Sequence, residues 1–333
     1  MLRYAIRRDI LDHPNERSSH VRATPRGGGV GIVATVEGLL VVATLAGLMP
    51  LRLLAAVGGG GALVAAVGWI DDQRGLSART RASIHFVAAV WAVTWLRGVP
   101  IVTLGAHVWH VGPLGAILAV IGIVWATNLF NFMDGIDGIA GSEAAVTGLA
   151  AAIMLSAVAS DLAIAFILVA GASAGFLRWN WMPARIFMGD AGSGYLGFVL
   201  AVLALAAQNA EVLALPLSLV LYGVFVMDAT TTLLRRVLAG ERWYGAHRSH
   251  AYQRAVQAGA SHAAVTTGVV VLNMALVACV VIAQRNAEAA VPALGVAIAL
   301  VVVAYLVVER VRPMRPRRPA TDTAIRADGE PPA

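Results

Sequence analysis

Charged residues and cysteine are scarce in this sequence, and lysine is missing. Only 13% of its 333 residues are charged, whereas soluble domains carry about a quarter. Hydrophobic residues make up 59% and the mean hydropathy is +0.75, so the composition predicts a membrane protein. The single cysteine, Cys279, lies in an apolar run. This excludes an intramolecular disulfide and a cysteine zinc cluster.

All 25 basic residues are arginine, and we draw no functional conclusion from that bias. The net charge of +6 and the pI near 10.2 would suit a nucleic-acid-binding protein. However, the arginines are scattered between apolar segments, and no basic region interleaved with aromatic residues occurs. We therefore predict no nucleic-acid partner.

Ten apolar segments follow an arginine-rich stretch of 28 residues, and each is about long enough to cross a bilayer as a helix. The predicted fold is an all-α, polytopic integral membrane protein with about ten transmembrane helices. The segments are 29–49, 53–70, 82–97, 113–131, 139–160, 162–178, 193–207, 212–233, 263–284 and 290–308. We expect one transmembrane catalytic domain over 1–308, with a cytoplasmic segment over 1–28 and a long cytoplasmic loop over 234–262. Residues 309–333 are expected to form a basic, disordered tail.

The arginines also predict the orientation of the chain. If the N-terminus is cytoplasmic and all ten segments cross, only Arg52, Arg97 and Arg285 face the other side. The remaining 22 arginines are then cytoplasmic, as the positive-inside rule requires. The same alternation places every polar cluster described below at a cytoplasmic end.

Two adjacent carboxylates, Asp71 and Asp72, end the second apolar segment. One of them can position a cation or act as a general base while the other supports it, provided that a metal or an arginine offsets their repulsion. The alternative is a solvated loop that ends the segment, with nearby arginines as anchors. The pair alone does not decide between the two.

The stretch from Asn128 to Gly141 places two amides and two carboxylates at the mouth of the fourth segment. Asn128 and Asn131 share one helical face, Asp134 continues it, and Asp137 follows. Magnesium prefers such oxygen ligands together with phosphate and water. A polar helix cap with Asx turns would explain one or two of the four residues but not all of them. We therefore predict a functional site.

Two further clusters carry polar side chains. In 189–193, glycines would let backbone N–H groups and a metal-bound phosphate approach Asp190, although Gly-Ser-Gly can also be the tight start of a helix. In the long loop, His247 and His250 lack an obvious third partner for zinc. With Arg248 they are better suited to a diphosphate, because a guanidinium can bind phosphate oxygens with two N–H groups.

Together, these motifs resemble those of the polytopic polyprenyl-phosphate N-acetylhexosamine-1-phosphate transferase family (glycosyltransferase family 4), in the family's order. This family also includes phospho-N-acetylmuramoyl-pentapeptide transferase. The matching stretches are Asp12–Gly29, Asp71–Arg81, Asn128–Gly141, Phe187–Gly197 and Asp228–Arg254. The His247-Arg248-Ser249-His250 form is similar to the O-antigen-initiating branch, whereas the muramoyl-pentapeptide branch would be expected to show consecutive histidines.

The resemblance implies a reaction and a set of roles. A UDP-N-acetylhexosamine and undecaprenyl phosphate would give undecaprenyl-diphospho-sugar and UMP, with Mg2+ or alternatively Mn2+, to initiate O-antigen or another cell-surface polysaccharide. Asp71 and Asp72 are implied as the catalytic pair, with Asp71 activating the lipid phosphate. Asp190 is implied as a metal ligand, with Asn131 at or beside the metal. The implied substrate-binding residues are Arg26, Asn128, Asp134, Asp137, His247, Arg248 and His250.

The implied location is the bacterial inner membrane, with the active site on the cytoplasmic face. The expected partners are the nucleotide sugar, undecaprenyl phosphate and membrane lipid, and a homodimer stays open. The alternatives are a muramoyl-pentapeptide-type transferase and a transporter of lipid-linked substrates, although a transporter would gather its site near the midplane between repeats. Family members usually carry one more span before the Asp-x-Pro-Asn stretch. We therefore expect either that this helix is absent or that Met1 is an internal start.

Overall fold

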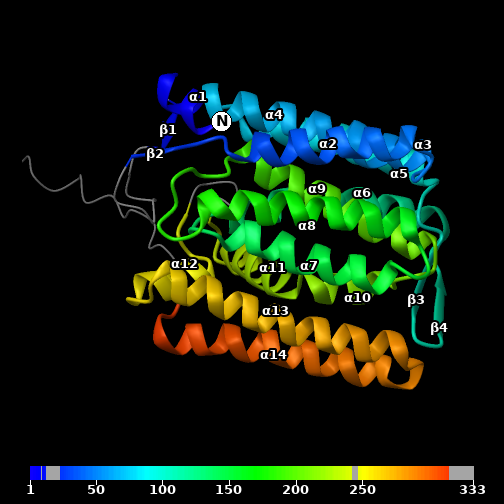
Figure 1. Cartoon of the computed structure of the whole chain (residues 1–333). Coiled ribbons are helices and arrows are strands. Elements are labelled where there is room, and N and C mark those ends of the chain that lie inside the picture. The colour runs from blue at the N-terminus through cyan, green and yellow to red at the C-terminus, as the bar shows by residue number, and fades with distance from the viewer. Residues whose placement is uncertain (9, 13–22, 242–246, 315–333) are drawn as a thin grey trace, which may run out of the picture.

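A computed structural model describes residues 1–8, 10–12, 23–241 and 247–314. Long helices lie roughly side by side, with the hairpin β3–β4 at one end and α1, β1, β2 and α12 at the other (Figure 1). We call these the β3–β4 end and the α12 end.

The N-terminal half contains α1 (Leu2–Arg7), β1 (Leu11–Asp12), β2 (Thr24–Pro25), α2 (Gly29–Leu45), α3 (Leu51–Leu54), the π-helix η1 (Ala55–Gly59), α4 (Gly60–Arg74), α5 (Ala78–Leu96), β3 (Ile101–Leu104), β4 (His107–His110) and α6 (Gly112–Met133). The remainder contains α7 (Ile139–Leu155), α8 (Ser160–Asn180), α9 (Asp190–Asn209), α10 (Leu215–Leu221), α11 (Gly223–Leu238), α12 (Ala251–Gln257), α13 (His262–Arg285), the 3-10 helix η2 (Ala287–Ala289) and α14 (Ala290–Val311).

The predicted class, an all-α polytopic membrane protein, is confirmed. In the described part of the chain, six helices are long and apolar enough to cross a membrane, or seven if α10 and α11 form one broken span. Helices α2 and α7 are apolar but shorter. Each of the ten predicted segments coincides with a helix or with adjoining helices. The hairpin β3–β4 was not predicted; it pairs antiparallel from Ile101 with His110 to Leu104 with His107.

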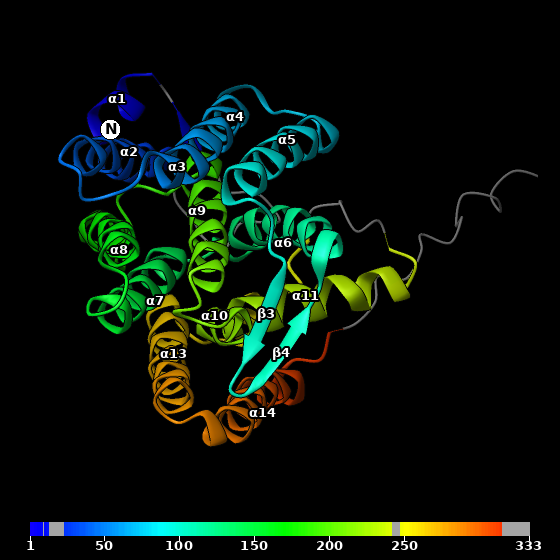
Figure 2. The same cartoon turned by 90° about the vertical axis from the view of Figure 1, so that its right-hand side faces the viewer.

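Helix α9 lies at the centre of the bundle, with α2, α4, α6, α7 and α8 around it (Figure 2). Of its most apolar 18 residues, 89% are buried. Two glycines bring its first turn against neighbouring backbone. A Cβ at Gly29 would lie 2.3 Å from the Cα of Gly192, and one at Gly68 would lie 2.5 Å from the carbonyl oxygen of Asp190. The start of α9 is therefore held against the start of α2 and the end of α4.

The π-helix η1 interrupts the second predicted segment, and glycines within and just after it face a charged side chain. A Cβ at Gly58 would lie 2.7 Å from Oε2 of Glu37, and one at Gly61 would lie 2.8 Å from the ring of Tyr195. The glycines at 58 and 61 thus allow close contact between helices, as small residues do in membrane proteins. Glu37, a charged residue within α2, faces these glycines and Tyr195.

The segment predicted over 212–233 is broken in the structure. The chain bends by 85° between α10 and α11, and α11 then runs across the other helices instead of along them (Figure 2). The physical reason is the composition of its two faces. Asp228, Thr232 and Arg236, spaced four residues apart, are buried, whereas Leu234 and Leu238 are exposed. Crossing the bundle gives the polar face partners and leaves the apolar face exposed.

Two predicted boundaries also differ from the structure. The domain was expected to end at residue 308, but α14 continues to Val311 and Glu309 makes several polar contacts, described below. The rest of the predicted tail, 315–333, lies outside the described residues. The loop expected over 234–262 includes the last turn of α11 and the short helix α12.

Candidate active site

The side chain of Asp72 caps helix α9. Its Oδ1 accepts a hydrogen bond from the backbone N–H of Asp190 at 2.9 Å, and its Oδ2 accepts one from Ala191 at 3.2 Å. The first N–H groups of a helix have no partner within the helix and carry partial positive charge, so they suit a buried carboxylate. Gly189 has a positive φ of 78°, and a Cβ there would lie 2.6 Å from Oδ2 of Asp72. Glycine is required at this close approach.

Two arginines neutralise three carboxylates around this cap. Arg26 Nε lies 2.8 Å from Asp72 Oδ1, and its Nη2 lies 2.6 Å from Asp190 Oδ1. Arg81 pairs with Asp71 and lies 3.3 Å from Asp190 Oδ2. We call these five residues the acidic cluster. The repulsion expected between Asp71 and Asp72 is therefore offset by arginines. Burial works against the charge of Arg26, but Asp190 and Asp72 raise its pKa overall.

Arg26 is positioned by backbone pairing at the α12 end. The two-residue strands β1 and β2 pair antiparallel, and the segment after β2 runs beside the loop that precedes α9. The Phe187 N–H donates to Pro25 at 2.8 Å, and the Gly28 N–H donates to Phe187 at 2.9 Å. Residues 25–28 thus pair with the loop before α9 at this end, whereas 13–22 lie outside the described residues.

The two predicted amides have different surroundings. Asn131 Nδ2 donates to Ser193 Oγ at 3.1 Å, and Ser193 Oγ donates to the Gly189 carbonyl at 3.1 Å. Asn131 therefore borders the acidic cluster from α6. Asn128, one turn earlier, donates to the Val124 carbonyl of its own helix at 2.7 Å.

The two carboxylates after α6 also separate. Asp134 follows the end of α6, where burial and the nearby Asp190 raise its pKa to about 7. Asp137 lies elsewhere: its Oδ2 accepts from the Ala184 N–H at 3.0 Å, and its Oδ1 lies 3.4 Å from His262 Nδ1. Asp134 thus adjoins the acidic cluster, whereas Asp137 joins the α6–α7 connection to α13 and to the loop before α9.

Asp228 caps α12 as Asp72 caps α9. Its carboxylate accepts from the N–H groups of Ala251 at 2.7 Å and Tyr252 at 3.1 Å, and its Oδ1 lies 3.4 Å from His250 Nδ1. His250 is only 3% exposed. Of the three residues predicted to bind a diphosphate, His250 is therefore buried against Asp228 at the start of α12. His247 and Arg248 are half-buried and closer to solvent.

Tyr252 connects this loop to the end of α6. Its hydroxyl donates to the Phe132 carbonyl at 3.0 Å. A Cβ at Gly135 would lie 2.1 Å from the Tyr252 hydroxyl oxygen. The His250 and Phe132 rings stack with centroids 6.2 Å apart. Sequence reasoning gave no separate role to Tyr252. Its signal was its place two residues after His250, in the same motif as the histidines, where a buried aromatic side chain could have been expected to anchor the loop.

The acidic cluster contains oxygens of the kinds that hold magnesium. Carboxylates from α4 and α9 and the amide of Asn131 are hard ligands, so the donor set fits this ion. Among the residues that the structure describes, however, no group of three or more His, Cys, Asp or Glu side chains is arranged to hold a metal. A metal ion would therefore have to compete with Arg26 and Arg81 for the carboxylate oxygens.

An apolar cavity of about 280 Å³ lies between α6, α9, α10 and α11. Phe130, Gly197 and Tyr222 are among its lining residues. Phe130 precedes Asn131 in α6, and Gly197 lies about one turn after Ser193 in α9. The cavity therefore begins about one helical turn below the hydrogen bond between Asn131 and Ser193.

These features define a polytopic membrane protein with a charged site at one end of its helices and an apolar cavity beneath that site. The chain belongs to glycosyl transferase family 4, whose profile matches residues 54–208. The predicted resemblance is confirmed. The chain is 30% identical over 271 residues to a probable undecaprenyl-phosphate N-acetylglucosaminyl 1-phosphate transferase of Bacillus subtilis, covering 78% of this chain and 73% of that protein.

Two further relatives show the range of the family. A decaprenyl-phosphate N-acetylglucosaminephosphotransferase of Mycobacterium tuberculosis (strain H37Rv) is 32% identical over 291 residues, covering 78% of this chain and 72% of the relative. A phospho-N-acetylmuramoyl-pentapeptide-transferase of Thermosynechococcus vestitus is 36% identical over 233 residues, covering 65% of this chain and 60% of the relative.

Proposed function

We propose that this protein transfers N-acetylhexosamine 1-phosphate from a UDP-sugar to undecaprenyl phosphate in the bacterial inner membrane. The products are undecaprenyl-diphospho-sugar and UMP, and the reaction initiates a cell-surface polysaccharide such as O-antigen. The observation that carries this proposal is the acidic cluster at the end of the helices, directly above an apolar cavity. The names of the relatives supply the pairing of a sugar phosphate with a prenyl phosphate.

The cavity supports a lipid acceptor. Its walls are almost wholly apolar side chains of α6, α9, α10 and α11, and apolar surface favours an isoprenoid chain over water. A prenyl phosphate whose first units lie in the cavity would have its headgroup at the level of Asn131 and the acidic cluster. Arg26 and Arg81, which both pair with Asp190, lie at that level.

The reaction needs little covalent assistance from the protein. An oxygen of the lipid phosphate attacks the β-phosphorus of the donor, and the bond from that phosphorus to the bridging oxygen breaks, so UMP leaves with that oxygen. The acceptor is already an anion near neutral pH. Asp71 accepts from the Leu76 N–H and pairs with Arg81, so it is engaged as an anion rather than free to form an aspartyl-phosphate. We therefore favour direct displacement, with positioning and charge neutralisation as the main contributions.

Asp190 and Asn131 would hold Mg2+, or alternatively Mn2+, with Asp72 beside them. The bound ion would neutralise charge on the phosphates. Asp134 lies next to this position and suits the nucleotide-sugar side. His247 and Arg248 would donate to the diphosphate, and the guanidinium of Arg248 could bind two phosphate oxygens at once. The excess of arginine on this side of the predicted spans supports a cytoplasmic active site.

The test is release of UMP by purified protein supplied with undecaprenyl phosphate and a panel of UDP-sugars, with Mg2+ or with EDTA. Asp72→Asn and Asp190→Asn should each lose about 100-fold or more in turnover, and EDTA should abolish it. Asp161→Asn is the matched control, because Asp161 lines a cavity at the β3–β4 end. Near-full activity of both variants, or full activity in EDTA, would overturn the assignment.

The panel also separates the alternatives. It includes UDP-N-acetylglucosamine, UDP-N-acetylgalactosamine, 6-deoxy sugars and UDP-N-acetylmuramoyl-pentapeptide. Turnover of the last donor alone would identify the muramoyl-pentapeptide reaction. Exchange of a lipid-linked substrate across vesicles without release of UMP would identify a transporter.

A further inference from the structure

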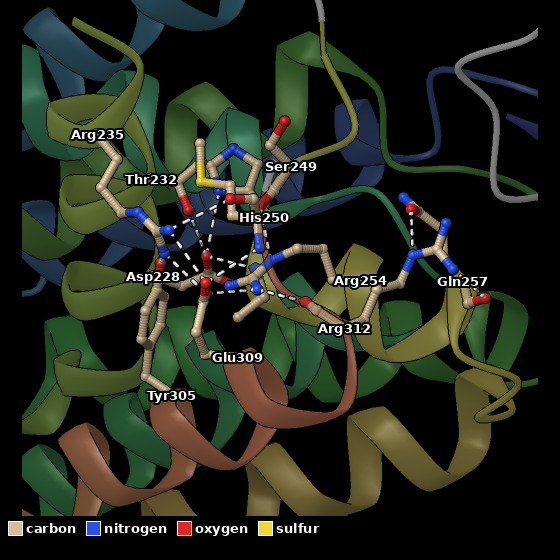
Figure 3. A network of polar contacts seen from close by, with 12 residues as sticks. Asp228, Thr232, Arg235, Ser249, His250, Arg254, Gln257, Tyr305, Glu309 and Arg312 are labelled. Carbon is tan, nitrogen blue, oxygen red and sulfur yellow. Dashed lines mark hydrogen bonds and ion pairs between the residues drawn. The ribbon is translucent and has the colours of Figure 1, made fainter. Parts of the chain in front are cut away.

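Glu309, near the end of α14, binds two arginines from two other helices (Figure 3). Its Oε2 accepts from Arg235 Nη1 and from Arg254 Nη1, both at 2.7 Å. Its Oε1 accepts from Arg235 Nη2 at 3.0 Å and from the Met314 N–H at 3.1 Å. One carboxylate therefore joins the end of α14 to both α11 and α12.

The second of these arginines reaches the loop that carries the histidines. Arg254 is 3% exposed, and its Nε donates to the Ser249 carbonyl at 3.1 Å. Its Nη1 also donates to the Arg312 carbonyl at 2.7 Å, and its guanidinium lies over the ring of Tyr305 at 5.3 Å. A buried guanidinium needs a carboxylate partner, and Glu309 supplies it.

The two arginines differ in what they hold. Arg235 pairs with Glu309 in the bidentate manner and also donates to the Tyr305 hydroxyl at 3.2 Å and the Met314 carbonyl at 3.3 Å. These partners all belong to α14 or to the residues just after it. Only Arg254 continues from Glu309 to the backbone between Arg248 and His250. The contact with Arg235 therefore joins α11 to α14, whereas the contact with Arg254 positions the backbone at Ser249.

We propose that Glu309 is a positioning residue that acts through Arg254 to hold residues 247–250 where His247 and Arg248 bind the diphosphate of the donor. The inference rests on the proposed function. It assigns a role in donor binding to a residue outside the family's matching motifs, on the last turns of the C-terminal helix. Asp228 fixes the start of α12 from one side, and Glu309 acts from the other side through Arg254, which donates to the Ser249 carbonyl.

The first test needs no turnover. Amide hydrogen exchange is followed in the full-length protein and in Glu309→Gln, Arg235→Met and Glu288→Gln. Glu309→Gln should raise exchange at 249–254 by about tenfold or more, because Arg254 loses its carboxylate. Arg235→Met keeps the pair between Glu309 and Arg254, so its exchange at 249–254 should stay near that of the wild type. Glu288→Gln is the control, because Glu288 is exposed in η2, just before the start of α14, and Glu309 lies near the end of α14.

The second test measures donor binding in steady-state kinetics. Glu309→Gln should raise KM for the UDP-sugar about tenfold, with KM for undecaprenyl phosphate changed less than about twofold. Adding Glu309→Gln to Arg248→Ala should cost much less than it does in the wild type, because both changes remove one interaction with the diphosphate. A residue that only stabilises the fold would lower activity additively and without preference for one substrate.

The outcomes are separable from those of the proposed function. Unchanged exchange at 249–254 in Glu309→Gln overturns the positioning role whether or not the protein releases UMP. Equal effects of Arg235→Met and Glu309→Gln, or additive loss with Arg248→Ala, also overturn it and assign Glu309 to helix packing. If exchange at 249–254 is faster in Glu309→Gln but the wild type releases no UMP with any donor, the proposed function is refuted and, with it, the role in donor binding.

Discussion

The carboxylate of Asp72 accepts a hydrogen bond from the backbone N–H of Asp190 at 2.9 Å. Two acidic residues 118 positions apart in the chain are thus in direct contact, one at the end of α4 and one at the start of α9. The contact uses the unpaired N–H groups of a helix N-terminus. Because Asp72 both caps α9 and borders the site, its substitution should affect geometry and charge together.

Arg81 should matter far more than Arg79, although both lie in the first turns of α5. Arg81 pairs with Asp71 and Asp190, whereas Arg79 is exposed. Arg81→Ala leaves two carboxylates with less compensation and should lower kcat/KM about 100-fold, while Arg79→Ala should stay within about twofold. UMP release measures both. Equal losses in the two variants would show that only the total charge of this region matters.

Gly135→Ala should disturb the contact between α12 and the end of α6. The new Cβ would lie 2.1 Å from the Tyr252 hydroxyl, and such overpacking costs about 1–3 kcal/mol. Tyr252→Phe in the same background should recover part of the loss. Gly122→Ala on α6 is the control, because a Cβ there would meet no atom of the described residues within 4 Å. Thermal unfolding in detergent gives the comparison, and a wild-type midpoint for Gly135→Ala would contradict the packing described here.

Stability should fall on acidification partly because of His247. Burial, followed by the nearby His250 and Arg236, lowers its pKa to about 3, although Glu241 and Asp228 act in the opposite direction. The unfolded value is about 6.5. The fold therefore favours the neutral imidazole, and its contribution to stability is complete above pH about 6.5 and is lost as pH falls toward 3.

The measurement for His247 is the thermal midpoint against pH in the wild type and in His247→Gln. The variant should lose less stability between pH about 7 and about 4, because glutamine does not titrate. Parallel curves for the two proteins would mean that His247 has an ordinary pKa in the folded state.

A buried pair on α7 and α13 should stabilise the membrane-embedded part of the fold. Asn273 Nδ2 donates to Glu143 Oε2 at 2.5 Å, and both side chains are fully buried. Asn273→Leu removes the donor and should cost about 1–3 kcal/mol in the free energy of unfolding. Glu143→Gln keeps a partner for Asn273 and should cost less. If the double variant Glu143→Leu/Asn273→Leu is less stable than Asn273→Leu alone, the hydrogen bond between the two side chains is not the source of the lost stability.

The apolar segments and the three aspartates of the acidic cluster were predictable from the sequence. Long apolar runs are read directly as helices, and Asp71, Asp72 and Asp190 each end or begin such a run. Their convergence followed from the order of the motifs and from the resemblance to the family. The arginine partners were foreseen only as a class, since repulsion between carboxylates requires a cation but does not say which one.

The remaining features depend on contacts that no local pattern encodes. The bend before α11 falls within a continuous apolar run, and its cause, the buried polar face from Asp228 to Arg236, becomes clear only with the partners in place. Asp137 shares a motif with Asp134 but turns to Ala184 and His262. Glu309 stands next to a run of arginines and prolines that looks like a tail, and its role depends on Arg254, 55 positions earlier.

The π-helix η1 has a consequence for the direction in which Asp72 points. Each residue of an α-helix turns the chain by about 100°, and a π turn holds one residue more than an α turn. Deleting a single residue from 55–59 would convert the π turn to an α turn and preserve the angular phase of everything after it relative to α3. Deleting one from the regular part of α4 instead would rotate the Asp72 carboxylate about a quarter of a circle away from α9. A one-residue deletion should thus be tolerated within η1, whereas the same deletion in α4 should break the contact between Asp72 and the start of α9.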